Sequence, residues 1–307
     1  MRELLKTEHL SVSFFTKSGE VEAVRDVSLT VEEGEVLAIV GESGCGKSAL
    51  CKSIMKLLPK TAKIKSGKIL ADGIDITDYT QRNMSRLRGD LFSMIFQDPM
   101  TSLNPTMTIG KQIEEAVRIH NKKMPKKQVK EKVLELMQLV EIDEPEVRIS
   151  QYPHEFSGGM RQRAMIAIAV ACEPKILIAD EPTSALDVTV QAQVVKEMMS
   201  LRDNFQTSII IVTHSMSVIS QMVDKVAVMY SGNIVEYGDK EDILRNPKHP
   251  YTKALIDAVP KMDGTIPKGI KGNPPLFTEN ITGCSFAPRC EKCNEVCIKN
   301  QQYLKKM

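Results

Sequence analysis

Long apolar runs are missing from this sequence of 307 residues. A membrane-spanning helix needs about 18–20 consecutive residues that are mostly apolar and uncharged, and no segment approaches that length. The first ten residues, MRELLKTEHL, have charges scattered through them, and this pattern is not that of a secretory signal. The sequence therefore predicts a cytoplasmic protein.

An excess of charge of one sign is also missing. The 41 Lys and Arg residues nearly balance 39 Asp and Glu residues, so that the formal net charge is +2. Such a balance gives no overall attraction to nucleic acids or to anionic membranes. With 42% hydrophobic residues, the chain is long enough for one large domain with an appendage, or for two modest domains.

The first third of the sequence is patterned for strands. Apolar and polar residues alternate over residues 3–40, which predicts several short strands joined by turns at KSGE and EEGE. A helix is expected over residues 48–58, ended by Pro59, and a turn-rich hairpin region follows to about residue 80. The apolar segment LFSMIFQ predicts a buried strand that ends at Gln97.

The middle of the sequence changes to helical periodicity. Residues 106–150 have apolar residues at helical spacing, including a stripe of Val129, Val133, Leu136 and Val140, which predicts a helical insertion. The segment MIAIAVACEP is apolar all round, so we expect a buried helix that ends at Pro174.

Two β-branched runs, KILIAD and TSIIIVTH, are typical of parallel strands covered on both faces. The helix VTVQAQVVKEMMSLRDNF is expected between them, and KVAVMY, SGN and IVEYG predict a hairpin after them. Beyond about residue 245 the chain is rich in Pro, Gly and Lys, which indicates an appended tail.

The segment GESGCGKS at residues 41–48 fits the phosphate-binding pattern G-x-x-x-x-G-K-[ST], and it lies between a predicted strand and a predicted helix. Backbone amides of the loop and the helix N-terminus would hold the phosphates, Lys47 would neutralise their oxygens, and Ser48 would ligate Mg²⁺. Cys45 is read as a small filler. The predicted nucleotide-binding residues of this segment are Gly41, Ser43, Gly44, Cys45, Gly46, Lys47, Ser48 and Ala49.

The segment ILIADE at residues 176–181 predicts a carboxylate at the end of a buried strand. Asp180 would hold Mg²⁺ through water, and Glu181 would act as the general base on the attacking water. A strand that ends in Asp-Glu is weak evidence by itself, but the upstream phosphate-binding pattern makes it strong.

Six independent motifs (GESGCGKS, IFQDP, FSGGMRQR, ILIADEP, SALD and VTH) make residues 3–245 resemble the ATP-binding subunits of ABC transporters. The resemblance implies an α/β P-loop NTPase fold, with a RecA-like core, an antiparallel β subdomain and an inserted α-helical subdomain at about residues 98–173. We expect the ATPase domain over residues 1–245, and a small C-terminal extension with a metal-binding cysteine cluster over residues 246–307.

The resemblance also implies a head-to-tail dimer that buries two ATP molecules. Gln97 would contact Mg²⁺ or water, and His214 would hold the γ-phosphate and orient Glu181. Phe14 would stack on adenine, although Phe15 is adjacent and could do so instead. The signature Ser157, Gly158 and Gly159 would complete the site of the facing subunit, whose γ-phosphate they cap, and Asp187 would line the dimer seam.

Two further segments, FQDPMTSLNP and HPYTKALIDAVP, resemble the dipeptide and oligopeptide importer branch of these ATPases, and GCSFAPRC also matches it. The resemblance implies ATP and Mg²⁺ as ligands, two membrane permeases as partners, an external peptide-binding protein as an indirect partner, and no nucleic acid. It implies a peripheral position on the cytoplasmic face of the inner membrane. The facing ATPase is either identical or homologous.

Four of the seven cysteines, Cys284, Cys290, Cys293 and Cys297, crowd into fourteen residues with the spacing C-x₅-C-x₂-C-x₃-C. Four thiolates in a short segment suit a [4Fe–4S] cluster or tetrahedral Zn²⁺. Members of the importer branch carry such a cluster, which favours iron–sulfur. The branch pattern C-x₅-C-x₆-C with a later Cys fits three of the four, so Cys293 is the fourth ligand or that ligand is absent.

Two alternatives to peptide import remain open from the sequence. Nickel importers share the same branch. Soluble ABC ATPases act in DNA repair, ribosome remodelling and iron–sulfur assembly without a permease, but the chain has one cassette, shows no sustained heptads and contains HPYTKAL.

Overall fold

The computed structural model of the chain describes residues 2–184, 186–259, 269–275 and 281–300. These residues form two compact units. The first unit combines Met1–Tyr79 with Val212–Met307, and the second unit is Thr80–Ile211. Among the described residues, none of the helices is both long enough and apolar enough to cross a membrane.

The first unit contains a four-stranded antiparallel sheet in the order β2-β1-β4-β5. Its strands are β1 (Glu3–Thr16), β2 (Gly19–Glu32), β4 (Ala62–Ala71) and β5 (Ile74–Asp75). The turns predicted at KSGE and EEGE are confirmed, but β1 and β2 are each 14 residues long rather than short. The register between β1 and β2 shifts at several places, as β-bulges do, and such bulges bend a long ribbon and increase its twist.

The first unit also holds three strands in the order β10-β9-β3. Strand β3 (Val36–Val40) is fully buried and pairs in parallel with β9 (Lys225–Tyr230), while β9 forms the predicted antiparallel hairpin with β10 (Asn233–Asp239). The helices of this unit are α1 (Lys47–Ile54), α9 (Met216–Met222), α10 (Lys240–Arg245), α11 (Pro250–Asp257) and α12 (Glu295–Lys299), with a 3₁₀ turn η2 (Ala287–Arg289).

Helix α1 is shorter than predicted, because it ends at Ile54 and not at Pro59. Lys56 adopts a left-handed conformation with φ 53°, and its N–H bonds to the Ser53 carbonyl. The Leu57 N–H reaches back to the Lys52 carbonyl at 2.8 Å. This is a Schellman closure, in which a lysine occupies the position that usually favours glycine.

The second unit contains β8 (Ser208–Val212), β7 (Ile176–Asp180) and β6 (Phe92–Ile95) in the order β8-β7-β6. Strands β7 and β8 are buried along their whole length, as their β-branched sequences predicted. Strand β6 pairs in parallel with β7 and ends at Ile95, two residues before the predicted end at Gln97.

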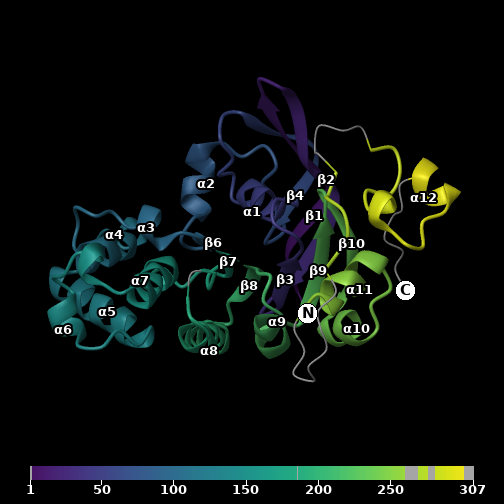
Figure 1. The fold of residues 1–307 in the computed structure, drawn as a ribbon. Helices are drawn as coiled ribbons and strands as arrows, with labels where there is room; N and C mark the ends of the chain where they lie inside the picture. The colour runs from purple at the N-terminus through teal and green to yellow at the C-terminus, as the bar shows by residue number, and fades with distance from the viewer. Residues whose placement is uncertain (1, 185, 260–268, 276–280, 301–307) are drawn as a thin grey trace. The chain divides into compact units, whose positions relative to one another are not determined.

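Figure 1 shows the helices α4, α5, α6 and α7 of the second unit grouped together. The sequence pattern predicted helices in this part of the chain. The predicted stripe of Val129, Val133, Leu136 and Val140 is buried in this group. The helices and turns of the unit are α2 (Gln81–Leu87), α3 (Pro99–Ser102), α4 (Ile109–His120), α5 (Lys126–Leu139), α6 (Pro145–Arg148), η1 (Pro153–Glu155), α7 (Gly158–Val170) and α8 (Val188–Phe205).

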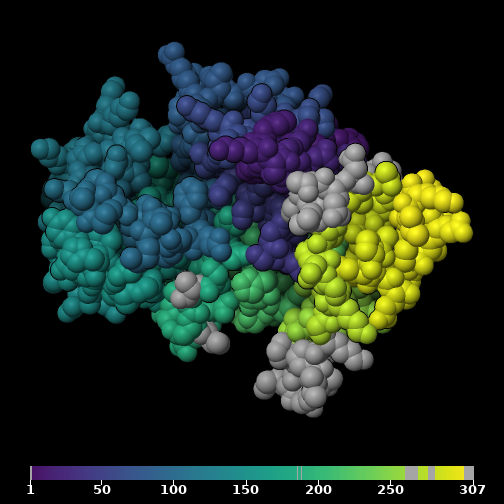
Figure 2. Space-filling view, turned by 45° about the horizontal axis from the view of Figure 1, so that its top comes forward, coloured from purple at the N-terminus to yellow at the C-terminus, as the bar shows by residue number. Residues whose placement is uncertain are grey.

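The C-terminal residues 281–300 have little regular structure and lie against the preceding helices of the first unit. In Figure 2 the yellow atoms of this segment continue the surface formed by the yellow-green residues before them. Phe286 provides the contact, because its buried ring lies 5.3 Å from the ring of Tyr251 in α11. The segment is therefore anchored by an aromatic side chain and not by a core of its own.

Candidate nucleotide site

The segment Gly41–Ser48 forms the turn between the buried strand β3 and helix α1. Gly46 caps the helix with a φ of 109°, and Gly41 and Gly44 have φ values of 154° and 77°. A Cβ on Gly41 would collide with the Met229 carbonyl oxygen, and one on Gly46 with the Ala23 carbonyl oxygen. Only glycine combines this backbone path with so close an approach.

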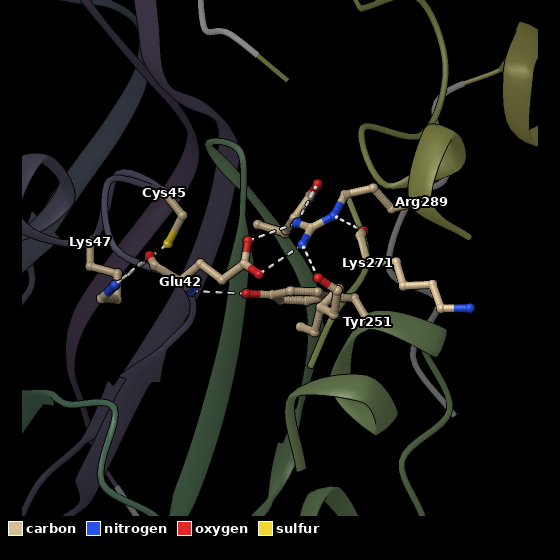
Figure 3. Close-up of polar contacts among 8 residues, drawn as sticks. Glu42, Cys45, Lys47, Tyr251, Lys271 and Arg289 are labelled. Atoms are coloured by element: carbon tan, nitrogen blue, oxygen red, sulfur yellow. Dashed lines mark hydrogen bonds and ion pairs between the residues drawn. The ribbon is translucent and has the colours of Figure 1, made fainter. Parts of the chain in front are cut away.

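The ammonium group of Lys47 lies over this loop and is almost completely buried. Its Nζ donates hydrogen bonds to the carbonyl oxygens of Gly41, at 2.9 Å, and Glu42, at 2.8 Å (Figure 3). Nζ also lies 3.7 Å from the Cys45 Sγ, and burial raises the pKa of that thiol. The loop therefore has a fixed cation beside the start of a helix, which is the arrangement that binds phosphate groups.

The loop is supported from outside by three residues. The Gly232 N–H, in the turn between β9 and β10, donates to the Cys45 carbonyl at 2.9 Å. The Glu42 N–H donates to the Tyr251 hydroxyl at 2.9 Å, and the Glu42 carboxylate pairs with Arg289. The sequence reasoning did not identify Glu42, Tyr251 or Arg289 as site residues. The signals were present, because Tyr251 and Arg289 lie in HPYTKAL and GCSFAPRC, but both segments were used only as family markers.

A second group of predicted residues comes together in the second unit. Asp180 ends strand β7 and is 3% exposed, and Glu181 follows it with a left-handed φ of 49°. The Gln97 Nε2 donates to the Glu181 Oε2 at 3.0 Å, although the two residues are 84 positions apart in the sequence. The parallel pairing of β6 with β7 places both side chains at the carboxyl ends of adjacent strands.

The signature segment begins helix α7. The Ser157 side chain caps the helix by accepting from the Met160 N–H at 3.3 Å. Apart from its chain neighbours and its own helix backbone, no described residue lies within 4 Å of a Cβ built on Gly158, whereas a Cβ on Gly159 would lie 2.9 Å from Val190 in α8. Asp187 caps α8 by accepting from the N–H groups of Thr189 and Val190. The Ser157 and Gly158 surface is exposed, so a ligand has access to the N-terminus of α7.

Two predicted residues lie elsewhere in the first unit. His214 follows β8 and has an exposed side chain. Phe14 in β1 is half-buried, whereas Phe15 is 40% exposed. The ammonium groups of Lys63 and Lys65 lie 5.9 and 5.5 Å from the centre of the Phe15 ring.

Comparison of the sequence with known protein families agrees with the phosphate-binding loop and the strands described above. Residues 24–184 match the ABC transporter family, and residues 235–297 match the oligopeptide/dipeptide transporter C-terminal region. The chain belongs to the ABC transporter family. The resemblance found in the sequence is therefore confirmed, and so are the P-loop ATPase fold and the assignment as an ATP hydrolase.

Two relatives of this ABC ATPase are similar over nearly all of its length. The dipeptide transport ATP-binding protein DppD of Bacillus subtilis is 49% identical over 300 residues, which are 97% of this chain and 89% of the relative. The oligopeptide transport ATP-binding protein AppD of the same organism is 47% identical over 307 residues, which are 99% of this chain and 93% of the relative.

A solved structure supports the ABC ATPase fold. The ATP-binding cassette MJ0796, solved as a dimer in a post-hydrolysis state bound to ADP and Pi, superimposes with a TM-score of 0.70 at 25% identity. The match covers 77% of this chain and 99% of that one.

The four clustered cysteines do not form a metal-binding group in the residues that the structure describes, where no three His, Cys, Asp or Glu side chains converge on one point. The Cys284 N–H bonds to the Cys297 carbonyl at 2.7 Å. Burial raises the pKa of the Cys284 thiol, and the neighbouring Cys297 and Cys290 raise it further. The backbones of Cys284 and Cys297 are therefore in contact, but the predicted iron–sulfur or zinc site is not supported by the arrangement of the four thiols.

The loop geometry generates a prediction about glycine. Gly46→Ala should lower the free energy of unfolding by roughly 3 kcal/mol or more, because the methyl group meets a backbone carbonyl and the φ is left-handed. Gly44→Ala is the matched control, because its φ is also positive but a Cβ there would contact no described residue beyond its chain neighbours, so the loss should be about 1–2 kcal/mol. Urea denaturation measures both. Equal losses for the two variants would contradict the close approach at Gly46.

Proposed function

We propose that the chain is the ATP-hydrolysing subunit of an importer for dipeptides or oligopeptides. It would work beneath two membrane permeases, to which an external peptide-binding protein delivers the peptide. The observation that carries this proposal is the near-full-length similarity to dipeptide and oligopeptide transport ATP-binding proteins. The match of residues 235–297 to the oligopeptide/dipeptide C-terminal region supports the same branch. The chain would lie peripherally at the cytoplasmic face of the inner membrane.

The phosphates of ATP would bind to the loop Gly41–Ser48. Lys47 is already held at the loop by two carbonyls, and phosphate oxygens would take over its hydrogen bonds. The proposed Mg²⁺ ligands are Ser48, Asp180 (through water) and Gln97, because hydroxyl, carboxylate and amide oxygens suit this ion. When bound, the metal ion would neutralise part of the negative charge of the phosphates. For adenine, the greater exposure of Phe15 favours this ring over Phe14.

Glu181 would accept the proton of the attacking water. Its hydrogen bond from Gln97 holds the carboxylate at the end of β7, and His214 would orient it and hold the γ-phosphate. Glu181 has a left-handed backbone, with a φ of 49°, directly after Asp180 ends the strand.

The facing subunit would complete each site. Ser157, Gly158 and Gly159 begin helix α7, whose N-terminal N–H groups and dipole favour an anion. Because a Cβ on the exposed Gly158 would contact no non-neighbouring group among the described residues, we assign the space beside it to the γ-phosphate of the neighbour's ATP. Asp187 would lie at the same seam. ATP binding would close the dimer and move the permeases, and hydrolysis would open it.

Nickel import and soluble ABC ATPase functions are not favoured. The similar proteins are named for dipeptide and oligopeptide transport. The test of cargo is hydrolysis by the subunit reconstituted with its permeases in lipid vesicles. Peptide and its binding protein should stimulate hydrolysis, and stimulation by nickel alone would overturn the peptide assignment.

Glu181→Gln should bind ATP normally but lower kcat by about 100-fold or more, because the amide cannot accept the proton from water. The variant should accumulate as a dimer with ATP, which light scattering after gel filtration measures. Glu146→Gln, at an exposed position in α6, is the matched control. Near-normal hydrolysis by the Glu181 variant would remove this residue from the mechanism.

Gly158→Asp tests the divided site. Gly158 is exposed and a Cβ there contacts no non-neighbouring group among the described residues, so the melting temperature should stay the same. It places a negative charge against the neighbour's γ-phosphate, so we expect loss of ATP-dependent dimers and of at least about 99% of hydrolysis. Unchanged turnover in the assembled transporter would show that each subunit hydrolyses ATP alone.

We also propose that the segment with Cys284, Cys290, Cys293 and Cys297 takes up a [4Fe–4S] cluster, with Zn²⁺ as the alternative. The spacing and the softness of four thiolates support this, and the metal would staple a segment without a core. Protein purified without oxygen should contain about four iron atoms per chain and absorb visible light. Cys290→Ser should remove the metal and Cys172→Ser should not. Protein without either metal would refute the proposal.

A further inference from the structure

Arg289 in the C-terminal segment forms a two-pronged ion pair with Glu42 of the phosphate-binding loop (Figure 3). Its Nη1 donates to the Glu42 Oε2 at 2.8 Å, and its Nη2 donates to Oε1 at 3.1 Å. The two residues are 247 positions apart in the sequence. Nothing in the ATPase mechanism described above uses this contact.

The guanidinium group is built into its site and does not lie loosely on the surface. Its side chain is 5% exposed. Besides Glu42, Nη1 donates to the Tyr230 hydroxyl at 3.2 Å, Nη2 to the Ile270 carbonyl at 3.3 Å, and Nε to the Lys271 carbonyl at 3.0 Å. All five N–H groups of the arginine therefore have an acceptor. The hydrogen bonds to Glu42 are the largest cause that raises the pKa of Arg289.

Local structure explains how Arg289 reaches the loop. The turn η2 has three residues per turn, so Phe286 and Arg289 point to the same side. Phe286 is 2% exposed and packs at 5.2 Å, edge to face, on Tyr230 of β9. The Phe286 anchor thereby fixes the direction of the arginine.

Tyr251 holds the same loop residue at its backbone. The tyrosine is fully buried beside Tyr230, and its hydroxyl accepts the Glu42 N–H at 2.9 Å. The Glu42 carbonyl in turn accepts from Lys47 at 2.8 Å. Glu42 is thus held at its N–H, its carbonyl and its carboxylate, and two of the three contacts come from the C-terminal part of the chain.

We propose that Arg289 and Tyr251 are positioning residues of the ATP site, which act on the nucleotide through Glu42. A carboxylate within the phosphate-binding loop repels a triphosphate, and Arg289 both neutralises that charge and holds it away from the anion. Tyr251 holds the loop backbone in the conformation that presents Lys47. The inference rests on the proposed role of this loop in binding ATP.

The test compares Arg289→Met with Arg245→Met in the full-length protein. Arg245 is the matched control, because it is an exposed arginine of the same unit, paired with Glu241 within α10. Titration with a fluorescent ATP analogue should show a dissociation constant raised about tenfold for Arg289→Met and unchanged for Arg245→Met. The KM for ATP should rise by the same factor, while kcat stays within about twofold.

Three readouts separate this role from a merely structural one. The loss of affinity should shrink as ionic strength is raised to about 0.5 M, since screening weakens the repulsion between Glu42 and the phosphates. Adding Glu42→Gln to Arg289→Met should restore the affinity to within about threefold of the original protein. Arg289→Lys, which keeps the charge but not the fork, should lose less than the methionine variant.

Tyr251→Phe keeps the ring and provides a second variant if Arg289→Met folds poorly. It should raise the dissociation constant in the same direction. A melting temperature lowered in any of these variants without a change in ATP affinity would overturn the proposal. If the unaltered protein bound no ATP, the proposed function itself would be refuted.

Discussion

The structure depends on one backbone path, the left-handed turn that connects strand β3 to helix α1. Gly41 and Gly46 approach carbonyl oxygens so closely that no side chain fits. The Lys47 ammonium group lies back over the turn, where it donates hydrogen bonds to the Gly41 and Glu42 carbonyl oxygens. A buried ammonium group costs solvation free energy, and hydrogen bonds to carbonyl oxygens offset only part of it. The loop is therefore prepared for the stronger acceptors that a phosphate provides.

Much of this organisation could be predicted from the sequence, because each element has a local signal. The buried strands β7 and β8 have uninterrupted β-branched runs, and the helix over residues 188–205 agrees with its predicted bounds. Element ends were less predictable. Helix α1 ends at Ile54 and is closed by the left-handed Lys56 rather than by Pro59, and lysine carries no sequence signal for that conformation.

The pairing of Gln97 with Glu181 was predictable only in its parts. Both residues were identified from motifs, but their hydrogen bond follows from the parallel alignment of β6 with β7, which no local pattern fixes. The sequence analysis missed Arg289, Tyr251 and Glu42 because no local pattern fixes contacts between distant segments. Their contacts join segments more than 200 positions apart, and composition or periodicity gives no measure of such distances.

The C-terminal segment has no core that could fold it independently, and its order comes from Phe286 and Arg289. Both side chains rest on the surface that supports the phosphate-binding loop. Thermodynamic coupling is reciprocal. If the docked segment raises the affinity for ATP, bound ATP stabilises the docked segment by the same free energy. In the proposed arrangement this extension belongs to the nucleotide site, because the carboxylate that it neutralises is part of the loop itself.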